Sequence, residues 1–363
     1  MSFIRLNAKK YSYEEVKKEK FSSLSDYELK TLQFCAQWLN QQSHFSINTS
    51  GSTGNPKTII LSREQMRTSA HMTIDALGLS SQDKSLVCLN TEFIAGKMML
   101  VRGLEAGMEI YIIPPSANPF KDLTEKAGIT FTALVPYQFE TILRESPEKK
   151  TLFHKMKAVL IGGAPIHASL EERLQDLSSP IFHTFGMTET VSHIALRRVN
   201  GKERSENYKV LQSVSISVDA RNCLIIHSPF TKEPVITNDV VELIHTNTFK
   251  WMGRIDHVIN SGGIKIHPEK TEKIIERIFS ELHLEKRFVI AGFPHKDLGE
   301  AVFLIIEDAP WNQSKVDELR EKIKETGNKY EVPKKIFFID RFKETPTGKI
   351  DRLKTKEMLD SRS

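Results

Sequence analysis

The sequence predicts an α/β protein with a large N-terminal part and a small α+β C-terminal part. Between residues 58 and 161, short apolar runs alternate with amphipathic segments, which is typical of a mostly parallel sheet with helices on both faces. After residue 268, a helix, two strands and a second helix follow in close succession. Since 363 residues leave room for two domains, we expect the two parts to be separate domains.

The individual elements follow from apolar spacing and from helix-end signals. Leu32, Phe34 and Trp38 lie near helical spacing and predict a packing helix over 24–42. Ser62 suits the N-cap of a helix over 62–77. The other expected elements are helices at 94–106, 119–127, 137–145, 269–281 and 314–325, and strands at 58–61, 86–89, 109–113, 130–135, 158–161, 288–292 and 301–306.

The charge of the chain argues against a dedicated nucleic-acid binder. The net charge of +5 comes from 51 basic and 46 acidic side chains, and the basic residues are spread along the chain rather than gathered in one arm. We therefore expect no nucleic-acid partner. A mild positive balance still helps to attract anionic ligands.

Cysteine usage and hydropathy predict a cytoplasmic protein. Cys35, Cys88 and Cys223 are far apart and share no metal-ligand spacing, so we interpret them as thiols of a reducing compartment. The N-terminus has no apolar signal-peptide core, and no apolar run is long enough to span a bilayer. We therefore expect no membrane insertion.

Residues 48–57, Asn-Thr-Ser-Gly-Ser-Thr-Gly-Asn-Pro-Lys, form a candidate phosphate-binding loop. The run gathers four hydroxyls and a lysine, and its glycines let the backbone approach a ligand closely. A flexible linker has a similar composition, but the strand-like run 58–61 follows at once and favours the phosphate loop. The candidate ligands are Thr49, Ser50, Gly51, Ser52, Thr53, Gly54 and Lys57.

This loop does not fit the Walker A pattern, G-x-x-x-x-G-K-[ST]. Pro56 stands where the second glycine belongs, and proline has no N–H to offer a phosphate. A Walker loop also opens a helix, whereas Thr58, Ile59 and Ile60 are β-branched and typical of a strand. We therefore expect a phosphate loop of another class.

Gly162-Gly163-Ala164 and Thr237-Asn238-Asp239 are candidate nucleotide contacts. The first segment follows strand 158–161, and ligands of open α/β sheets bind beyond the carboxyl ends of strands. Small residues at that point let a flat base lie against the backbone. Taken alone, the first segment is better explained as a β-to-α turn, and the second as an ordinary turn.

Residues 183–193, His-Thr-Phe-Gly-Met-Thr-Glu-Thr-Val-Ser-His, place an aromatic ring, a hydroxyl and a carboxylate in one short loop. Phe185-Gly186 predicts a turn, and Thr188-Glu189-Thr190 follows it. We expect Phe185 to stack on adenine, Thr188 to bond the α-phosphate and Glu189 to hold Mg²⁺, which prefers hard oxygen ligands. A capped helix start with Thr188 as N-cap would explain the same segment.

Two glycine-containing segments lie in the C-terminal third of the chain. Residues 252–266 contain Gly262-Gly263, which predicts a tight β-hairpin turn. Residues 345–350, Thr-Pro-Thr-Gly-Lys-Ile, form a turn that carries Lys349. A solvated surface lysine is the usual explanation for such a turn.

Together these motifs resemble the adenylate-forming superfamily of acyl-CoA synthetases, luciferases and peptide-synthetase adenylation domains. The Ser/Thr-rich loop, Gly-Gly-Ala, Phe-Gly-Met-Thr-Glu, Thr-Asn-Asp, Met-Gly-Arg-Ile-Asp and Pro-Thr-Gly-Lys occur in the superfamily's order across 48–349. Asn238 departs from the pattern because glycine usually stands there. Only 47 residues precede the Ser/Thr-rich loop, fewer than is usual in the superfamily.

The resemblance implies a two-step reaction with ATP, Mg²⁺ and coenzyme A, in which an acyl-adenylate forms first and a thioester second. The Ser/Thr-rich loop would join two strands and cradle the β- and γ-phosphates. Asp239 would accept the ribose hydroxyls, and Arg254 would reach ribose or phosphate. Lys349 would contact the reacting carboxylate and the α-phosphate, which makes it catalytic together with Thr188 and Glu189.

The resemblance also implies a mobile C-terminal domain. It suggests an N-terminal ATP- and acyl-binding domain over 1–254, a hinge over 255–257 centred on Asp256, and a lid domain over 258–363. Gly262 and Gly263 would lie where the pantetheine thiol approaches the acyl-adenylate.

Within the superfamily, the chain is most similar to the o-succinylbenzoate–CoA ligases of menaquinone synthesis. Residues 188–192, Thr-Glu-Thr-Val-Ser, and 96–102, Gly-Lys-Met-Met-Leu-Val-Arg, resemble that family's versions of these segments. The substrate has a second carboxylate, which the resemblance assigns to Arg102, with Lys97 as another candidate. Residues five apart do not share one narrow helical face, so we expect only one of the two to point inward. We choose Arg102, because a guanidinium can bind a carboxylate through two hydrogen bonds and the resemblance implies a matching arginine in that family's pocket. Solvated surface charges at both positions would be the ordinary alternative.

Two other interpretations remain open at this point. The chain could be another aryl- or fatty-acyl-CoA ligase, or an acyl-AMP ligase that loads a carrier protein. It could also be a non-catalytic nucleotide-binding homologue, although the presence of Lys349, Glu189 and Asp239 argues against this. The oligomeric state is open as well, a homodimer included.

Overall fold

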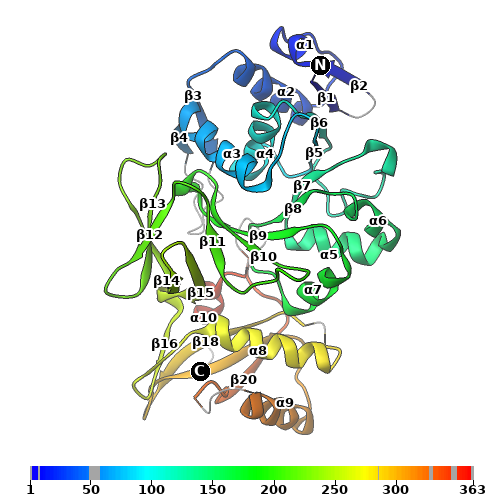
Figure 1. The fold of residues 1–363 in the computed structure, drawn as a ribbon. Helices are drawn as coiled ribbons and strands as arrows, with labels where there is room; N and C mark the ends of the chain where they lie inside the picture. The colour runs from blue at the N-terminus through cyan, green and yellow to red at the C-terminus, as the bar shows by residue number, and fades with distance from the viewer. Residues whose placement is uncertain are drawn as a thin grey trace.

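Figure 1 shows the computed structural model, in which a large N-terminal part adjoins a smaller C-terminal part. The structure describes residues 2–6, 9–48, 58–284, 286–326, 330–344 and 350–360. Within those ranges the large part contains a 13-stranded sheet and a two-stranded hairpin, and the small part contains a five-stranded sheet. The α/β class and the two-part organisation predicted from the sequence are confirmed.

The N-terminal half of the large sheet is parallel, as predicted, apart from its edge strand. Buried strands of this kind are apolar throughout because helices cover both faces. The strand order is β2 (Lys9–Ser12), β1 (Phe3–Leu6), β6 (Glu109–Ile112), β5 (Lys84–Val87), β7 (Phe131–Leu134), β8 (Ala158–Ile161) and β9 (Ile181–Gly186). Only β1 and β2 pair antiparallel in this half.

The other half of the sheet is antiparallel, which the expectation of a mostly parallel sheet did not include. Its connections are too short to carry the crossover helices that parallel neighbours require. From β9 outward, the order continues with β10 (His193–Arg198), β11 (Tyr208–Val210), β15 (Thr248–Arg254), β14 (Val235–His245), β13 (Cys223–His227) and β12 (Ser215–Val218).

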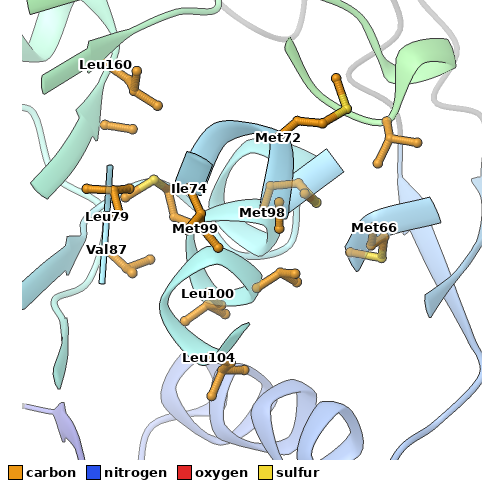
Figure 2. Packing of buried hydrophobic residues seen from close by; sticks show 14 of the residues in the cluster. Met66, Met72, Ile74, Leu79, Val87, Met98, Met99, Leu100, Leu104 and Leu160 are labelled. Carbon is orange, nitrogen blue, oxygen red and sulfur yellow. The ribbon is translucent and has the colours of Figure 1, made fainter. Parts of the chain in front are cut away.

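Helices pack on both faces of this sheet. The predicted cap is confirmed: the Ser62 side chain accepts a bond from the Gln65 backbone at the start of α3 (Arg63–Leu77). Figure 2 shows α4 (Ile94–Glu105) enclosed by apolar side chains, with its Met98 and Met99 buried. The other helices of this part are α1 (Tyr13–Lys17), α2 (Asp26–Leu39), α5 (Pro136–Glu145), α6 (Lys150–Phe153) and α7 (Ala168–Arg173).

The helix predicted over 119–127 is wrong. Only Glu125–Ala127 forms a single 3₁₀ turn there. Phe120 is fully buried and stacks on Phe153 with ring centroids 4.8 Å apart, so tertiary packing holds the preceding residues in turns. Burial of one aromatic side chain outweighs a weak local helix preference.

The small part is an α+β unit, as predicted. Its sheet contains β16 (Ile259–Ser261), β17 (Ile264–Ile266), β18 (Phe288–His295), β19 (Gly299–Glu307) and β20 (Lys335–Ile339). Its helices are α8 (Pro268–Glu281), α9 (Gln313–Thr326) and α10 (Arg352–Asp360). In Figure 1, α8 lies between the two parts, next to α7.

The cysteines and the hydropathy of the helices were also the subject of predictions. All three cysteines are free thiols and are buried. None of the helices in the described ranges has the length and apolar character needed to cross a membrane.

Candidate active site

The candidate phosphate loop connects the two strands of a hairpin. β3 (His44–Asn48) and β4 (Thr58–Ser62) pair antiparallel, and their last pair, Asn48 with Thr58, brackets the loop. A strand therefore follows the loop, as predicted, where a Walker A loop would open a helix. The candidate ligands lie outside the described residues, so their roles stay predictions: Thr49, Ser50, Gly51, Ser52, Thr53, Gly54 and Lys57.

The Gly162-Gly163-Ala164 turn at the carboxyl end of β8 leaves no room for larger side chains. A Cβ on Gly162 would lie 2.4 Å from Thr184 Oγ1, and Gly163 has a φ of +84°. His183 on β9 donates from Nε2 to the Ala164 carbonyl at 3.0 Å. The turn is therefore tightly packed and lacks large side chains, as a surface that binds a flat base requires.

His183 was not singled out by the sequence analysis, although it orients this turn. Tyr208 donates its hydroxyl to Nδ1 at 2.7 Å, which leaves the Nε2 proton for Ala164. Burial, followed by the charge of Arg197, lowers the pKa of His183 to about 3, so the ring is neutral. The only signal in the sequence was a histidine two residues before Phe185.

A strained turn shapes the loop between β9 and β10. A Cβ on Gly186 would lie 2.4 Å from Ser192 O, so only glycine allows this approach. Val191 has φ +61° and ψ −52°, and Ser192 N bonds Thr190 O at 2.5 Å, which defines a γ-turn of the rare, strained kind. Such strain persists only where the surrounding structure imposes it and is concentrated at functional sites.

Thr188 and Glu189 belong to this loop. Thr188–Thr190 form a 3₁₀ turn whose N-cap is Met187, so the alternative in which Thr188 is the N-cap is wrong. Glu189 is exposed, and within the described ranges neither its carboxylate nor the Thr188 hydroxyl makes a hydrogen bond or ion pair. Both groups are therefore available to a ligand.

The donor set at Glu189 fits Mg²⁺ bound together with a nucleotide. The described residues contain no cluster of three His, Cys, Asp or Glu side chains that would hold a metal by themselves. Mg²⁺ is usually held by one or two carboxylates, while water and substrate phosphates fill its other positions. A single free carboxylate is consistent with that mode of binding.

Phe185 lies at the end of an aromatic cluster. Its ring centroid is 5.6 Å from that of Tyr208 and 5.1 Å from that of Phe249. These contacts fix the ring, which is half-buried, against the sheet. Its stacking on adenine stays a prediction.

Arg102 is buried and pairs with no acidic side chain among the described residues, and its predicted inward orientation is confirmed. The residue is 2% exposed; Nη2 donates to Ser192 Oγ at 2.7 Å and lies 3.5 Å from His193 Nδ1. Its Nε is buried with no hydrogen-bond partner in the described ranges. Burial lowers the pKa of Arg102 to about 9, so it stays protonated at neutral pH. A buried, uncompensated cation favours an anionic ligand.

Lys97, the other candidate for the second carboxylate, has a different environment. Its amine donates to the backbone oxygens of Thr91 at 2.8 Å and Glu92 at 3.3 Å. It also lies 5.6 Å from the Phe34 ring centroid. These contacts fix the loop before α4, and they favour Arg102 over Lys97 as the substrate contact.

Asp239 lies within β14, so the interpretation of residues 237–239 as a turn is wrong. Asn238 is exposed and has no positive φ, which explains why glycine is not needed there. Trp251 donates to the Asp239 carboxylate at 2.9 Å. Burial raises the pKa of Asp239, and the Trp251 bond and the charge of Arg254 act in the opposite direction.

Arg254 and Asp256 form a bidentate pair where β15 ends. Arg254 Nε and Nη2 donate to the two carboxylate oxygens at 3.1 and 2.9 Å. Asp256 lies in the short 3₁₀ turn Ile255–His257 between the two parts of the molecule. Asp239 pairs with Arg254 across the β14–β15 ladder, so the structure brings these three predicted residues together.

Gly262 and Gly263 form the predicted hairpin turn between β16 and β17, with φ values of +58° and +80°. A Cβ on Gly263 would meet nothing within 4 Å, so its backbone is open to an approaching group. Lys349 lies outside the described residues. The CoA contact and the catalytic lysine therefore stay predictions.

Helix α8 contacts the large part at its first turn and again further along. A Cβ on Gly253 would lie 2.3 Å from Glu269 Oε2, so β15 and the first turn of α8 are in close contact. Further along α8, Glu276 accepts from His167 at 2.7 Å and from the Ala168 backbone at 3.3 Å. This second contact connects α8 to the start of α7.

We expect the contact between His167 and Glu276 to be pH-dependent. The hydrogen bond to Glu276 raises the pKa of His167 against an opposing effect of burial, and the charges of Glu140 and Glu272 add to the increase. Because the pKa is raised, the charged pair is fully present below the ordinary histidine pKa and is lost as pH rises through the raised value. An NMR titration of the His167 ring should show this shift, and Glu276→Gln should lower the midpoint. An unchanged midpoint in the variant would contradict the assignment.

A family model described as "AMP-binding enzyme" matches residues 9–235. A 2-succinylbenzoate–CoA ligase from Listeria monocytogenes serovar 1/2a is 24% identical over 358 residues, which cover 93% of this chain and 74% of the relative.

Two solved structures show the same architecture. An acyl-CoA synthetase (AMP-forming)/AMP-acid ligase II-like protein from Dyadobacter fermentans is 40% identical, with a TM-score of 0.64, and the match covers 94% of this chain and 97% of that one. An o-succinylbenzoate CoA synthetase from Bacillus subtilis, solved with the acyl-adenylate intermediate OSB-AMP, has a TM-score of 0.71 at 23% identity, covering 86% and 68%. The second likeness concerns the fold alone.

Proposed function

Because this chain belongs to the AMP-binding enzyme family, we propose that it is an AMP-forming acid–thiol ligase whose substrate is o-succinylbenzoate. The observation that carries the substrate assignment is Arg102, a buried cation beside the Thr188–Ser192 loop that pairs with no acidic side chain in the part of the chain that the structure describes. An acid with a second carboxylate would supply the missing negative charge. The names of the Listeria and Bacillus proteins agree with this substrate.

In the first proposed step, the succinyl carboxylate attacks the α-phosphorus of ATP and pyrophosphate leaves. Two anions must meet, so the site has to reduce their repulsion and align the reacting atoms. Thr188 would donate to the α-phosphate, and Glu189 would hold Mg²⁺, which supplies charge neutralisation when bound. Lys349 would stabilise the charge that develops in the transition state.

In the second proposed step, the thiolate of coenzyme A attacks the acyl-adenylate carbonyl and AMP leaves. This step needs Lys349 withdrawn and the Gly262–Gly263 turn brought to the adenylate. We assign residues 1–254 to an N-terminal domain, 255–257 to a hinge and 258–363 to a lid that rotates between the steps. The position of Asp256 in a short turn between the two sheets supports this division.

Asp256→Pro should spare adenylation and greatly reduce thioester formation. Proline fixes φ near −65°, so rotation at the hinge is impeded. Asp256→Ala is the matched control, because it removes the pair with Arg254 without restricting φ, and it should lose much less of the second step. Single-turnover measurements of both half-reactions test this; near-normal turnover of the proline variant would rule out Asp256 as the hinge.

The proposed function is tested by ATP–pyrophosphate exchange with a panel of carboxylic acids, followed by thioester assays with free coenzyme A. We expect exchange with o-succinylbenzoate and thioester formation with CoA. A preference for benzoate or fatty acids would identify a different CoA ligase. Exchange without transfer to CoA would favour an acyl-AMP ligase that loads a carrier protein, and absence of exchange with every acid would favour a non-catalytic homologue.

A further inference from the structure

Behind Arg102 lies a buried polar chain that the proposed reaction does not use. His193 Nε2 lies 2.9 Å from Thr73 Oγ1, and Thr73 Oγ1 donates to the Ser69 carbonyl at 3.3 Å. Thr73 is fully buried and His193 is 7% exposed. Polar side chains placed this deep are costly unless they are hydrogen-bonded, so their presence in an apolar helix–sheet interface needs an explanation.

The direction of every bond in this chain follows from one fact. Arginine can only donate, so His193 Nδ1 must accept from Arg102 Nη2. The proton of the neutral ring is then on Nε2 and is donated to Thr73, whose hydroxyl donates in turn to Ser69. Burial and the charge of Arg102 lower the pKa of His193 well below its ordinary value, which agrees with a neutral ring.

The other end of the chain faces the candidate site. Ser192 Oγ accepts from Arg102 Nη2 at 2.7 Å, and Ser192 is less buried than the residues behind it. Because Ser192 Oγ accepts a hydrogen bond from Arg102, its own hydroxyl proton is left for an acceptor outside this hydrogen-bonded set of side chains. The strained γ-turn at Val191 fixes the backbone at this point.

We propose that His193, oriented by Thr73, is the positioning residue for Arg102, and that its neutral ring makes the site select acids with a second negative charge. The proposal rests on the proposed function. A carboxylate in place of this ring would hold the guanidinium equally well but would neutralise it. A neutral acceptor fixes the orientation of the guanidinium and leaves its charge for the substrate. Such a site rejects a monoacid because the buried cation then stays unpaired.

The test compares His193→Glu with His193→Gln on two substrates: o-succinylbenzoate and 4-oxo-4-phenylbutanoate, the same acid without the ring carboxylate. Glutamine keeps a neutral acceptor for Arg102 and a donor for Thr73, so the preference for the diacid should survive. Glutamate supplies the missing charge within the protein. We expect it to reduce the kcat/KM ratio of diacid to monoacid roughly 5- to 100-fold through the KM of the diacid, with the KM of ATP little changed.

Thr73→Val provides a second test in case His193→Glu prevents folding. It removes the hydroxyl that orients the ring, and it should raise the KM of the diacid more than that of the monoacid. If wild-type enzyme prefers the diacid and both His193→Glu and Thr73→Val keep that preference, the positioning role is overturned and the proposed function stands. If wild-type enzyme shows no such preference, the proposed substrate and this proposal fall together.

Discussion

Arg102→Ala is expected to raise the KM for o-succinylbenzoate while the KM for ATP changes little. Arg102 is the only candidate substrate contact in the described residues that is both buried and without an acidic partner. A guanidinium can bind a carboxylate through two hydrogen bonds, and losing the partner of a buried charge should cost on the order of 2–5 kcal/mol in kcat/KM. Steady-state kinetics with varied acid at saturating ATP measures this loss.

Two variants separate substrate binding from general damage. Arg102→Lys keeps a cation but loses the fork geometry, so its activity should be intermediate. Arg67 is an arginine on the neighbouring helix α3 whose side chain is 49% exposed, and Arg67→Ala should behave like wild type. Unaltered kinetics of Arg102→Ala would refute the substrate assignment. Thermal unfolding of each variant shows whether a loss reflects instability.

Lys349→Ala is expected to abolish adenylation while largely sparing transfer of a preformed acyl-adenylate to coenzyme A. A cation is needed where a carboxylate meets the α-phosphate in the first step, whereas in the second step the thiolate attacks an uncharged carbonyl. Removing one preorganised group that stabilises a transition state typically reduces kcat by about 10²- to 10³-fold. ATP–pyrophosphate exchange measures the first step, and thioester release from synthetic acyl-adenylate measures the second.

Lys354 is a suitable control for this variant. It lies on α10, is exposed and pairs with Asp351 at 3.2 Å, so Lys354→Ala removes a nearby positive charge from the surface. Neither half-reaction should change in that control. An equal loss of both half-reactions in Lys349→Ala would contradict the role assigned to the lysine.

Much of the fold was predictable because local pattern and tertiary environment agree. Strand β8 was predicted at its observed bounds, and the start of α3 followed from the capping signal at Ser62. The predictions failed where distant contacts decide the conformation. Burial of Phe120 keeps its segment from forming a helix, and the antiparallel half of the large sheet depends on pairing between strands that the sequence analysis had not located.

The motifs that indicate an adenylate-forming enzyme could be recognised in the sequence because each depends on residue types at short spacing. Glycine at 162, 163 and 186 is required by crowding or by positive φ, and both constraints act on the residue itself. The spacing of Lys97 and Arg102 predicted that only one of them points inward. The choice of Arg102 came from guanidinium geometry and from the resemblance, and its burial agrees with that choice.

The sequence by itself therefore determined the α/β class, the order of the nucleotide motifs and the single buried cation on α4. Only the tertiary structure decided what surrounds that cation. Ser192 and His193 reach Arg102 from 90 and 91 residues further along the chain, and Thr73 reaches His193 across 120 residues. The physical reason is that a hydrogen-bonded chain between separate elements depends on how those elements pack, which no local spacing of residues records.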